Sequence, residues 1–201
     1  SDIEKKNKDG NYLFAIMVDD RLESLLKRLL DEAEFLSDYG IRSLSRSHKD
    51  NPYVFGYQGS NYSIQYEPGE SSSSMFGGNS NWRGPIWLPL NYLIINSLRK
   101  YYTYYGDKYT YEFPARSGNK LNLKQIANQL TLRLLKIFER NDTGKFQYHA
   151  SDQSCWSEDH FKEHHLFYEF FHGDTGQGLG ASHQTGWTAL IVNLLLEMDE
   201  D

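Results

Sequence analysis

Apolar residues recur at helical spacing in four stretches of the chain, and each stretch predicts a helix. The first helix is expected over residues 19–35, with an inward stripe formed by Leu22, Leu25, Leu26, Leu29, Leu30 and Ala33. The second is expected from Pro85 to Gly106, because proline suits the start of a helix and glycine its end. Its inward stripe comprises Leu90, Leu93, Ile94, Leu98, Tyr101, Tyr102 and Tyr105. Pro89 would lie in the first turn, so regular helix can begin one turn late.

The third and fourth helices lie in the second half of the chain. Asn122 and Gln125 have the spacing of a capping box, which predicts a helix that starts there and runs to about Phe138. The fourth helix is expected over residues 185–198, with Trp187, Leu190, Ile191, Leu194 and Leu195 facing inward. The only clear strand pattern is a small hairpin around Gly59, formed by residues 53–55 and 62–66.

The connections between these helices are long and rich in aromatic residues and glycine. Residues 37–84 and 141–183 greatly exceed the helix connections of simple bundles, which run to about 2–8 residues. Solvated linkers are not composed in this way, so we expect the helices to form a rigid scaffold with a site in the loops. Residues 1–18 are read as a polar N-terminal segment.

Composition and charge exclude several classes of protein. The chain has 201 residues, 15% of them aromatic, and a net charge of −6, which argues against a nucleic-acid or anionic-membrane partner. No apolar run reaches the roughly 18 residues of a membrane span. The single cysteine, Cys155, excludes an intramolecular disulfide and fits either a reducing compartment or a large core that needs no disulfide. We expect a cytoplasmic protein.

The first candidate site is the stretch Gly77–Trp87. Trp82 and Trp87 offer flat apolar faces and Arg83 offers a planar fork of donors, while Asn79 and Asn81 add amide groups. A sugar needs such partners, because its C–H face stacks on aromatic rings and its hydroxyls bind polar groups. The alternative is a glycine-rich turn into a helix, with both tryptophans in the core.

The second candidate is Glu169, a carboxylate among Phe167, Tyr168, Phe170 and Phe171. A buried charge is costly unless it has partners, and catalytic carboxylates are made in such surroundings. The alternative is a structural ion pair between Glu169 and an arginine. Asp174, in the turn Asp174–Gly176, is not predicted to be catalytic.

Three further sequence patterns point to other chemistry only weakly. His160 and His164 have the spacing of a zinc-binding helix, but Phe161 stands where the zincin pattern needs glutamate. Residues 176–180 are glycine-rich without phosphate-loop spacing, and Cys155 lacks a protease signature. We therefore expect no metal and no cofactor.

The combination of motifs resembles glycoside hydrolase family 63, above all its mannosylglycerate-hydrolase-like branch and the related processing α-glucosidases. The resemblance rests on residues 78–87 (GNSNWRGPIW), 168–176 (YEFFHGDTG) and 183–187 (HQTGW), and residues 34–45 look like another segment of the family. It covers most of the chain from about residue 20.

The resemblance implies the fold class, the mechanism and the site residues. The fold would be all-α, the C-terminal portion of an (α/α)6 toroid with long loops and at most a small β-hairpin, formed by residues 19–201. The enzyme would invert the anomeric configuration, with Glu169 as general base. The substrate-binding residues implied are Trp82, Arg83, Trp87, His183, Gln184 and Trp187. The general acid would come from an upstream segment.

The implied partners are a carbohydrate substrate and the remainder of the same catalytic domain. The isolated chain is therefore expected to lack turnover, and its uncovered apolar helix faces favour self-association into a homo-oligomer. The alternative function is a non-catalytic carbohydrate-binding or structural helical module.

Overall fold

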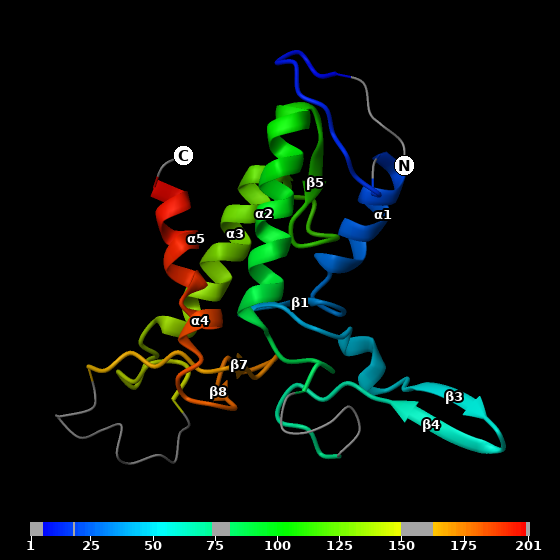
Figure 1. Cartoon of the computed structure of the whole chain (residues 1–201), viewed down its shortest axis with the longest axis vertical. Helices are drawn as coiled ribbons and strands as arrows, with labels where there is room; N and C mark the ends of the chain where they lie inside the picture. Colours follow the sequence, from blue (N-terminus) through cyan, green and yellow to red (C-terminus); the bar gives the residue numbers. More distant parts are fainter. Residues whose placement is uncertain (1–5, 18, 74–80, 150–162, 200–201) are drawn as a thin grey trace.

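The computed structural model describes residues 6–17, 19–73, 81–149 and 163–199 (Figure 1). The α-helices are α1 (Asp19–Leu29), α2 (Leu88–Tyr105), α3 (Leu123–Leu135), α4 (Thr185–Thr188) and α5 (Leu190–Asp199). Single 3₁₀ turns are η1 (Arg46–Lys49), η2 (Gly106–Lys108) and η3 (Lys136–Phe138). The strands are β1 (Leu36–Ser37), β2 (Gly40–Ile41), β3 (Tyr53–Tyr57), β4 (Ser60–Ile64), β5 (Thr110–Glu112), β6 (Lys120–Asn122), β7 (Phe170–Phe171) and β8 (Gly178–Leu179).

The centre of the molecule is a layer of helices in which α2 packs against both α3 and α5, and α3 packs against α5 (Figure 1). Their facing leucines and isoleucines form one core with α1 and with the loops below the helices. The loops that carry the candidate residues gather at the N-terminal end of α2 (Figure 1). The helices thus form a scaffold under the loops.

Two of the predicted helices differ from the observed ones in their bounds. The first ends at Leu29 instead of reaching residue 35, because Asp31 starts a turn in which its carboxylate accepts the N–H of Ala33. The second starts at Leu88 with Pro89 in its first turn, as expected. Its buried stripe is rotated from the predicted one, so that Leu93 is 63% exposed.

In the second half of the chain, the start of α3 agrees with the prediction, whereas the last predicted helix is divided into two. The capping box between Asn122 and Gln125 is confirmed at the start of α3. The expected last helix is interrupted at Ala189, where α4 closes and α5 begins. Ile191 and Leu194 are buried as predicted, whereas the predicted inward orientation of Leu195, which is 41% exposed, was wrong. Trp187 is 38% exposed, although its ring contacts that of the buried Trp87.

In the described part of the chain the strands form four separate antiparallel pairs, β1–β2, β3–β4, β5–β6 and β7–β8. The pair β3–β4 confirms the hairpin around Gly59. The other three pairs were missed, so the expectation of at most one hairpin was wrong. Strands of two or three residues are too short for an alternating pattern to be read in sequence. Within the described residues the fold is mostly helical, and none of its helices has the length and apolarity that crossing a membrane requires.

Candidate active site

Two tryptophans form a stack at the N-terminal end of α2. The rings of Trp82 and Trp87 lie 4.0 Å apart and within 3° of parallel. Trp87 is fully buried, and its ring also contacts Phe170, at 4.8 Å, and the edge of Trp187, at 5.6 Å. Trp82 is 49% exposed. The stack thus presents Trp82 to solvent and supports it from behind with Trp87.

The loop that holds Trp82 is fixed by a buried polar network. Asn81 donates to the carbonyls of Glu67 and Gly69, at 2.7 and 2.8 Å, and its side-chain oxygen accepts the N–H of Arg83. The guanidinium of Arg83 is buried and binds the carboxylate of Glu67 at 2.7 Å and the hydroxyl of Ser71 at 2.6 Å. The Trp87 indole N–H donates to the Asn81 carbonyl at 2.9 Å. Asn81, considered above as a sugar contact, instead holds the loop together.

Backbone hydrogen bonds join the three motifs that the sequence singled out. Ile86 and Phe171 exchange two N–H···O=C bonds, at 2.8 and 2.9 Å. The N–H of Gln184 donates to the carbonyl of Phe167 at 2.7 Å, and the hydroxyl of Thr188 donates to the carbonyl of Tyr168 at 2.5 Å. Segments about 80 and 100 residues apart in the chain therefore form one structural unit.

Glu169 lies inside this unit and is half-buried. Its backbone N–H donates to the carbonyl of Ala181, at 2.8 Å, and its carboxylate accepts the N–H of Ala181, at 3.3 Å. Gly180 has a φ of +68°, and a Cβ there would lie 2.7 Å from the Glu169 carboxylate. Glycine at this position lets the backbone approach the carboxylate closely.

Of the remaining expected site residues, His183 is exposed and Gln184 and Trp187 are partly exposed. His183 pairs with Phe167 through a single parallel β-bridge, and Gln184 and Trp187 lie at the start of α4. All three are therefore carried on the same unit as Glu169. Their contact with a sugar stays a prediction, as does that of Trp82, Arg83 and Trp87.

The carboxylate of Asp174, five residues after Glu169, is engaged in a second network. It binds the guanidinium of Arg42 at 3.0 Å and accepts the hydroxyl of Tyr66 at 2.9 Å. Burial opposes ionisation of Asp174, but the hydrogen bonds from Tyr66 and Arg42 and the charge of Arg42 outweigh it and lower the pKa. A carboxyl group with a lowered pKa is ionised at neutral pH and is unsuited to donate a proton. Asp174 is thus a structural residue.

Comparison with known proteins identifies the family. Residues 11–188 match the family of mannosylglycerate hydrolase MGH1-like glycoside hydrolase domains. The chain belongs to this family of glycoside hydrolases. It is 45% identical over 98% of its length to an uncharacterized protein of Saccharomyces cerevisiae, of which it covers 18%. It is 32% identical to a probable mannosyl-oligosaccharide glucosidase of Schizosaccharomyces pombe and 30% identical to a mannosyl-oligosaccharide glucosidase of S. cerevisiae, covering 88% and 87% of this chain and 15% of each relative. The chain therefore spans less than a fifth of the length of these relatives.

Several residues that position the glycoside hydrolase motifs were missed by sequence reasoning. Asn91 on α2 is buried and binds both backbone groups of Ile41 as well as the carbonyl of Trp87. Arg42 reaches from the segment after β2 to Asp174. Residues 34–45 were noted only as a family segment, and an isolated Asn or Arg gives no sequence signal of such a long-range contact.

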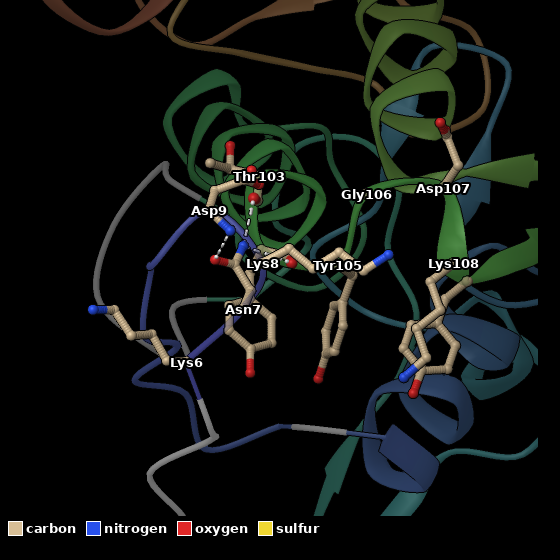
Figure 2. Close-up of a pocket in the computed structure, with 11 residues that line it drawn as sticks. Lys6, Asn7, Lys8, Asp9, Thr103, Tyr105, Gly106, Asp107 and Lys108 are labelled. Atoms are coloured by element: carbon tan, nitrogen blue, oxygen red, sulfur yellow. Dashed lines mark hydrogen bonds between the residues drawn. The ribbon is translucent and has the colours of Figure 1, made fainter.

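One cavity lies far from these motifs, at the opposite end of α2. Its volume is about 650 Å³, and residues 6–9 and 103–109 line it (Figure 2). Since α2 has 18 residues at about 1.5 Å each, about 27 Å of helix separates this cavity from Trp87. The cavity is therefore not part of the candidate active site.

The sequence also raised His160 as a metal ligand and Cys155 as a nucleophile. Both residues fall outside the described residues.

His172 adds a pH-dependent element beside Asp174. Burial lowers the pKa of His172, an effect that the nearby Asp174 carboxylate partly opposes. The Nδ1 atom accepts the N–H groups of Asp174 and Thr175, at 3.2 and 3.3 Å, as a neutral imidazole does.

This lowered pKa predicts that stability falls in mild acid. Below about pH 6.5 the unfolded chain takes up a proton that the folded His172 resists, so the free energy of unfolding decreases as the pH falls through this range. The variant His172→Asn keeps a hydrogen-bond acceptor but cannot titrate, and its unfolding midpoint should depend less on pH between 5 and 7. Burial also lowers the pKa of His149, so the unfolding midpoint of the His172→Asn variant should still depend on pH to some extent. Parallel pH profiles for the two proteins would contradict the prediction.

Proposed function

We propose that this chain carries the general base and part of the sugar pocket of an inverting α-glycoside hydrolase, of the α-glucosidase or α-mannosidase type. Residues 19–201 would form the C-terminal part of its (α/α)6 catalytic domain. The observation that carries the proposal is the joining of three family motifs, by the Ile86–Phe171 and Gln184–Phe167 hydrogen bonds, around a half-exposed tryptophan and a half-buried glutamate.

The chemistry assigned to Glu169 is proton removal from the attacking water. In an inverting enzyme a carboxylate activates water on one face of the sugar while an acid about 6.5–9.5 Å away protonates the leaving oxygen. The N–H of Ala181 and the close approach at Gly180 would hold the Glu169 carboxylate in one orientation. Orientation matters, because a general base must lie within hydrogen-bond reach of the proton that it removes.

The general acid has to come from another part of the protein. Asp174, five residues after Glu169, is bound to Arg42 and Tyr66 and has a lowered pKa. The chain covers less than a fifth of the length of its relatives, which is consistent with a general acid in the remainder of the domain. We therefore expect no turnover from the isolated chain. Its cytoplasmic location and its self-association stay predictions.

The sugar pocket would be built on the exposed face of Trp82, with Gln184, His183 and Trp187 beside it. Stacking on the Trp87 ring already restricts the orientation of the Trp82 ring. Sugar binding therefore loses little additional conformational entropy of Trp82. Arg83 and Trp87, both buried, would hold this surface in place, and their own contact with the sugar stays a prediction.

The sugar pocket is tested by the variant Trp82→Ala. Binding of maltose and of α-mannobiose to the chain would be measured by calorimetry. The disaccharide that binds should bind about tenfold more weakly, the loss typical of removing an aromatic anchor. Leu93→Ala, on the exposed face of α2, is the matched control and should bind as the original chain does. Equal affinity in both variants would remove Trp82 from the pocket.

The alternative is a non-catalytic carbohydrate-binding or structural helical module. It uses Trp82 and Gln184 in the same way but has no need of Glu169. The deciding experiment is therefore the turnover of the whole protein with glutamine at position 169.

A further inference from the structure

The hairpin β3–β4 has one aromatic face and one small polar face. Its register pairs Tyr53 with Ile64, Phe55 with Tyr62, and Tyr57 with Ser60. Since side chains alternate along a strand and paired residues share a face, the four rings of the hairpin project to the same side. The other side is formed by Val54, Gly56, Asn61 and Ser63.

The aromatic face is open to solvent. Tyr53, Phe55, Tyr57 and Tyr62 are each 50–55% exposed, and the rings of Phe55 and Tyr57 are stacked at 6.3 Å and 12°. The hairpin reaches away from the helices (Figure 1). A row of exposed rings on a projecting element is typical of an interaction surface.

The chemistry of the hairpin favours an uncharged partner that carries hydroxyl groups. Residues 51–66 contain no Asp, Glu, Lys or Arg, in a chain of which 24% of residues are charged. A nucleic acid or an anionic membrane would find no cation there. On the aromatic face the neutral hydrogen-bonding groups are the tyrosine hydroxyls and Ser60, which is paired with Tyr57, and in the turn Gln58 donates to the Tyr57 hydroxyl at 3.3 Å.

The hairpin is continuous with the candidate active site. Two residues after β4, the hydroxyl of Tyr66 donates to Asp174, and the next residue, Glu67, donates its N–H to the carbonyl of Arg83 at 2.7 Å. The Tyr66 ring lies against Gly84, where a Cβ would approach it to 2.7 Å. The base of the hairpin is therefore anchored on the loop that presents Trp82.

We propose that the aromatic face of β3–β4 binds a neutral oligosaccharide and extends the sugar-binding surface that begins at Trp82. This inference rests on the proposed function for the nature of the ligand. The rings would stack on the C–H faces of sugar units beyond those bound at Trp82, and the tyrosine hydroxyls, Ser60 and Gln58 would bind the hydroxyls of those units. The face would thus select long substrates over short ones.

The experiment compares ligands of two lengths on the chain. Binding of maltose, maltohexaose, α-mannobiose and a linear α-mannohexaose is measured by calorimetry for the original chain and for Phe55→Ala and Tyr57→Ala. We expect a hexasaccharide to bind, each variant to weaken it about tenfold, and the affinity for the disaccharide to stay unchanged. Val54→Ala, on the opposite face of the same hairpin, is the matched control and should bind both ligands normally.

Three outcomes would overturn the inference: equal hexasaccharide affinity in all variants, no hexasaccharide binding at all, or dissociation of a dimer by Phe55→Ala without change in sugar binding. The last outcome would make the face a contact between copies of the chain. A failure of the proposed function can be distinguished from a failure of this inference. The proposed function is tested by the turnover of the Glu169→Gln protein and by sugar binding of the Trp82→Ala variant, and neither substitution alters the hairpin.

Discussion

Replacing Glu169 by glutamine in the whole protein is expected to lower kcat by about 10²–10⁴-fold while sugar affinity is retained. Glutamine has the size of glutamate but cannot accept the proton of the attacking water, so the loss equals what a positioned general base contributes. The measurements are kcat, sugar affinity and unfolding midpoint.

The matched control is Glu163→Gln, an exposed glutamate that pairs with Arg140 at 2.8 Å. It should leave kcat within about twofold, because exposed ion pairs contribute little. In the Glu169→Ala variant, added azide should attack the anomeric carbon from the side that water would use. The product expected is therefore a glycosyl azide. Near-normal kcat in a destabilised Glu169→Gln protein would instead make Glu169 structural and favour the binding-module alternative.

Replacing Arg42 by methionine is expected to lower the free energy of unfolding by about 3 kcal/mol, because it leaves the partly buried charge of Asp174 without its partner. The guanidinium also binds the carbonyl of Leu36, at 2.5 Å, and the hydroxyl of Tyr66, at 3.0 Å. Denaturant unfolding of the chain gives the measurement. Because the side chain of Asp174 is 29% exposed, water can compensate part of the loss.

Two further proteins separate the charge from the other contacts of Arg42. Arg28→Met removes an exposed guanidinium that pairs with Glu34 and should scarcely move the midpoint. Arg42→Met combined with Asp174→Asn should be more stable than Arg42→Met alone, since the orphaned charge is gone. If the double variant is no more stable than the single one, the carbonyl contacts, and not the ion pair, account for the effect of Arg42.

The positions of the main helices were determined locally and could be predicted from the sequence. The capping box of α3, the proline in the first turn of α2 and the hairpin around Gly59 each depend on residues a few positions apart. The motifs around Trp82, Glu169 and Gln184 were also recognisable, because each is a contiguous string of residues. Their assignment to a glycoside hydrolase family was confirmed by the family match.

The sequence alone did not determine the features that depend on contacts between distant segments. The sequence did not show that packing against Glu67 and Phe170 buries Arg83 and Trp87, whose contact with a sugar stays a prediction. The turn sequence around Asp174 gave no sign of its ion pair with Arg42, 132 residues away. The three short strand pairs depend on the same long-range packing. Local patterns determine where a helix or a motif lies, whereas the tertiary structure decides which of its side chains remain exposed to meet a ligand.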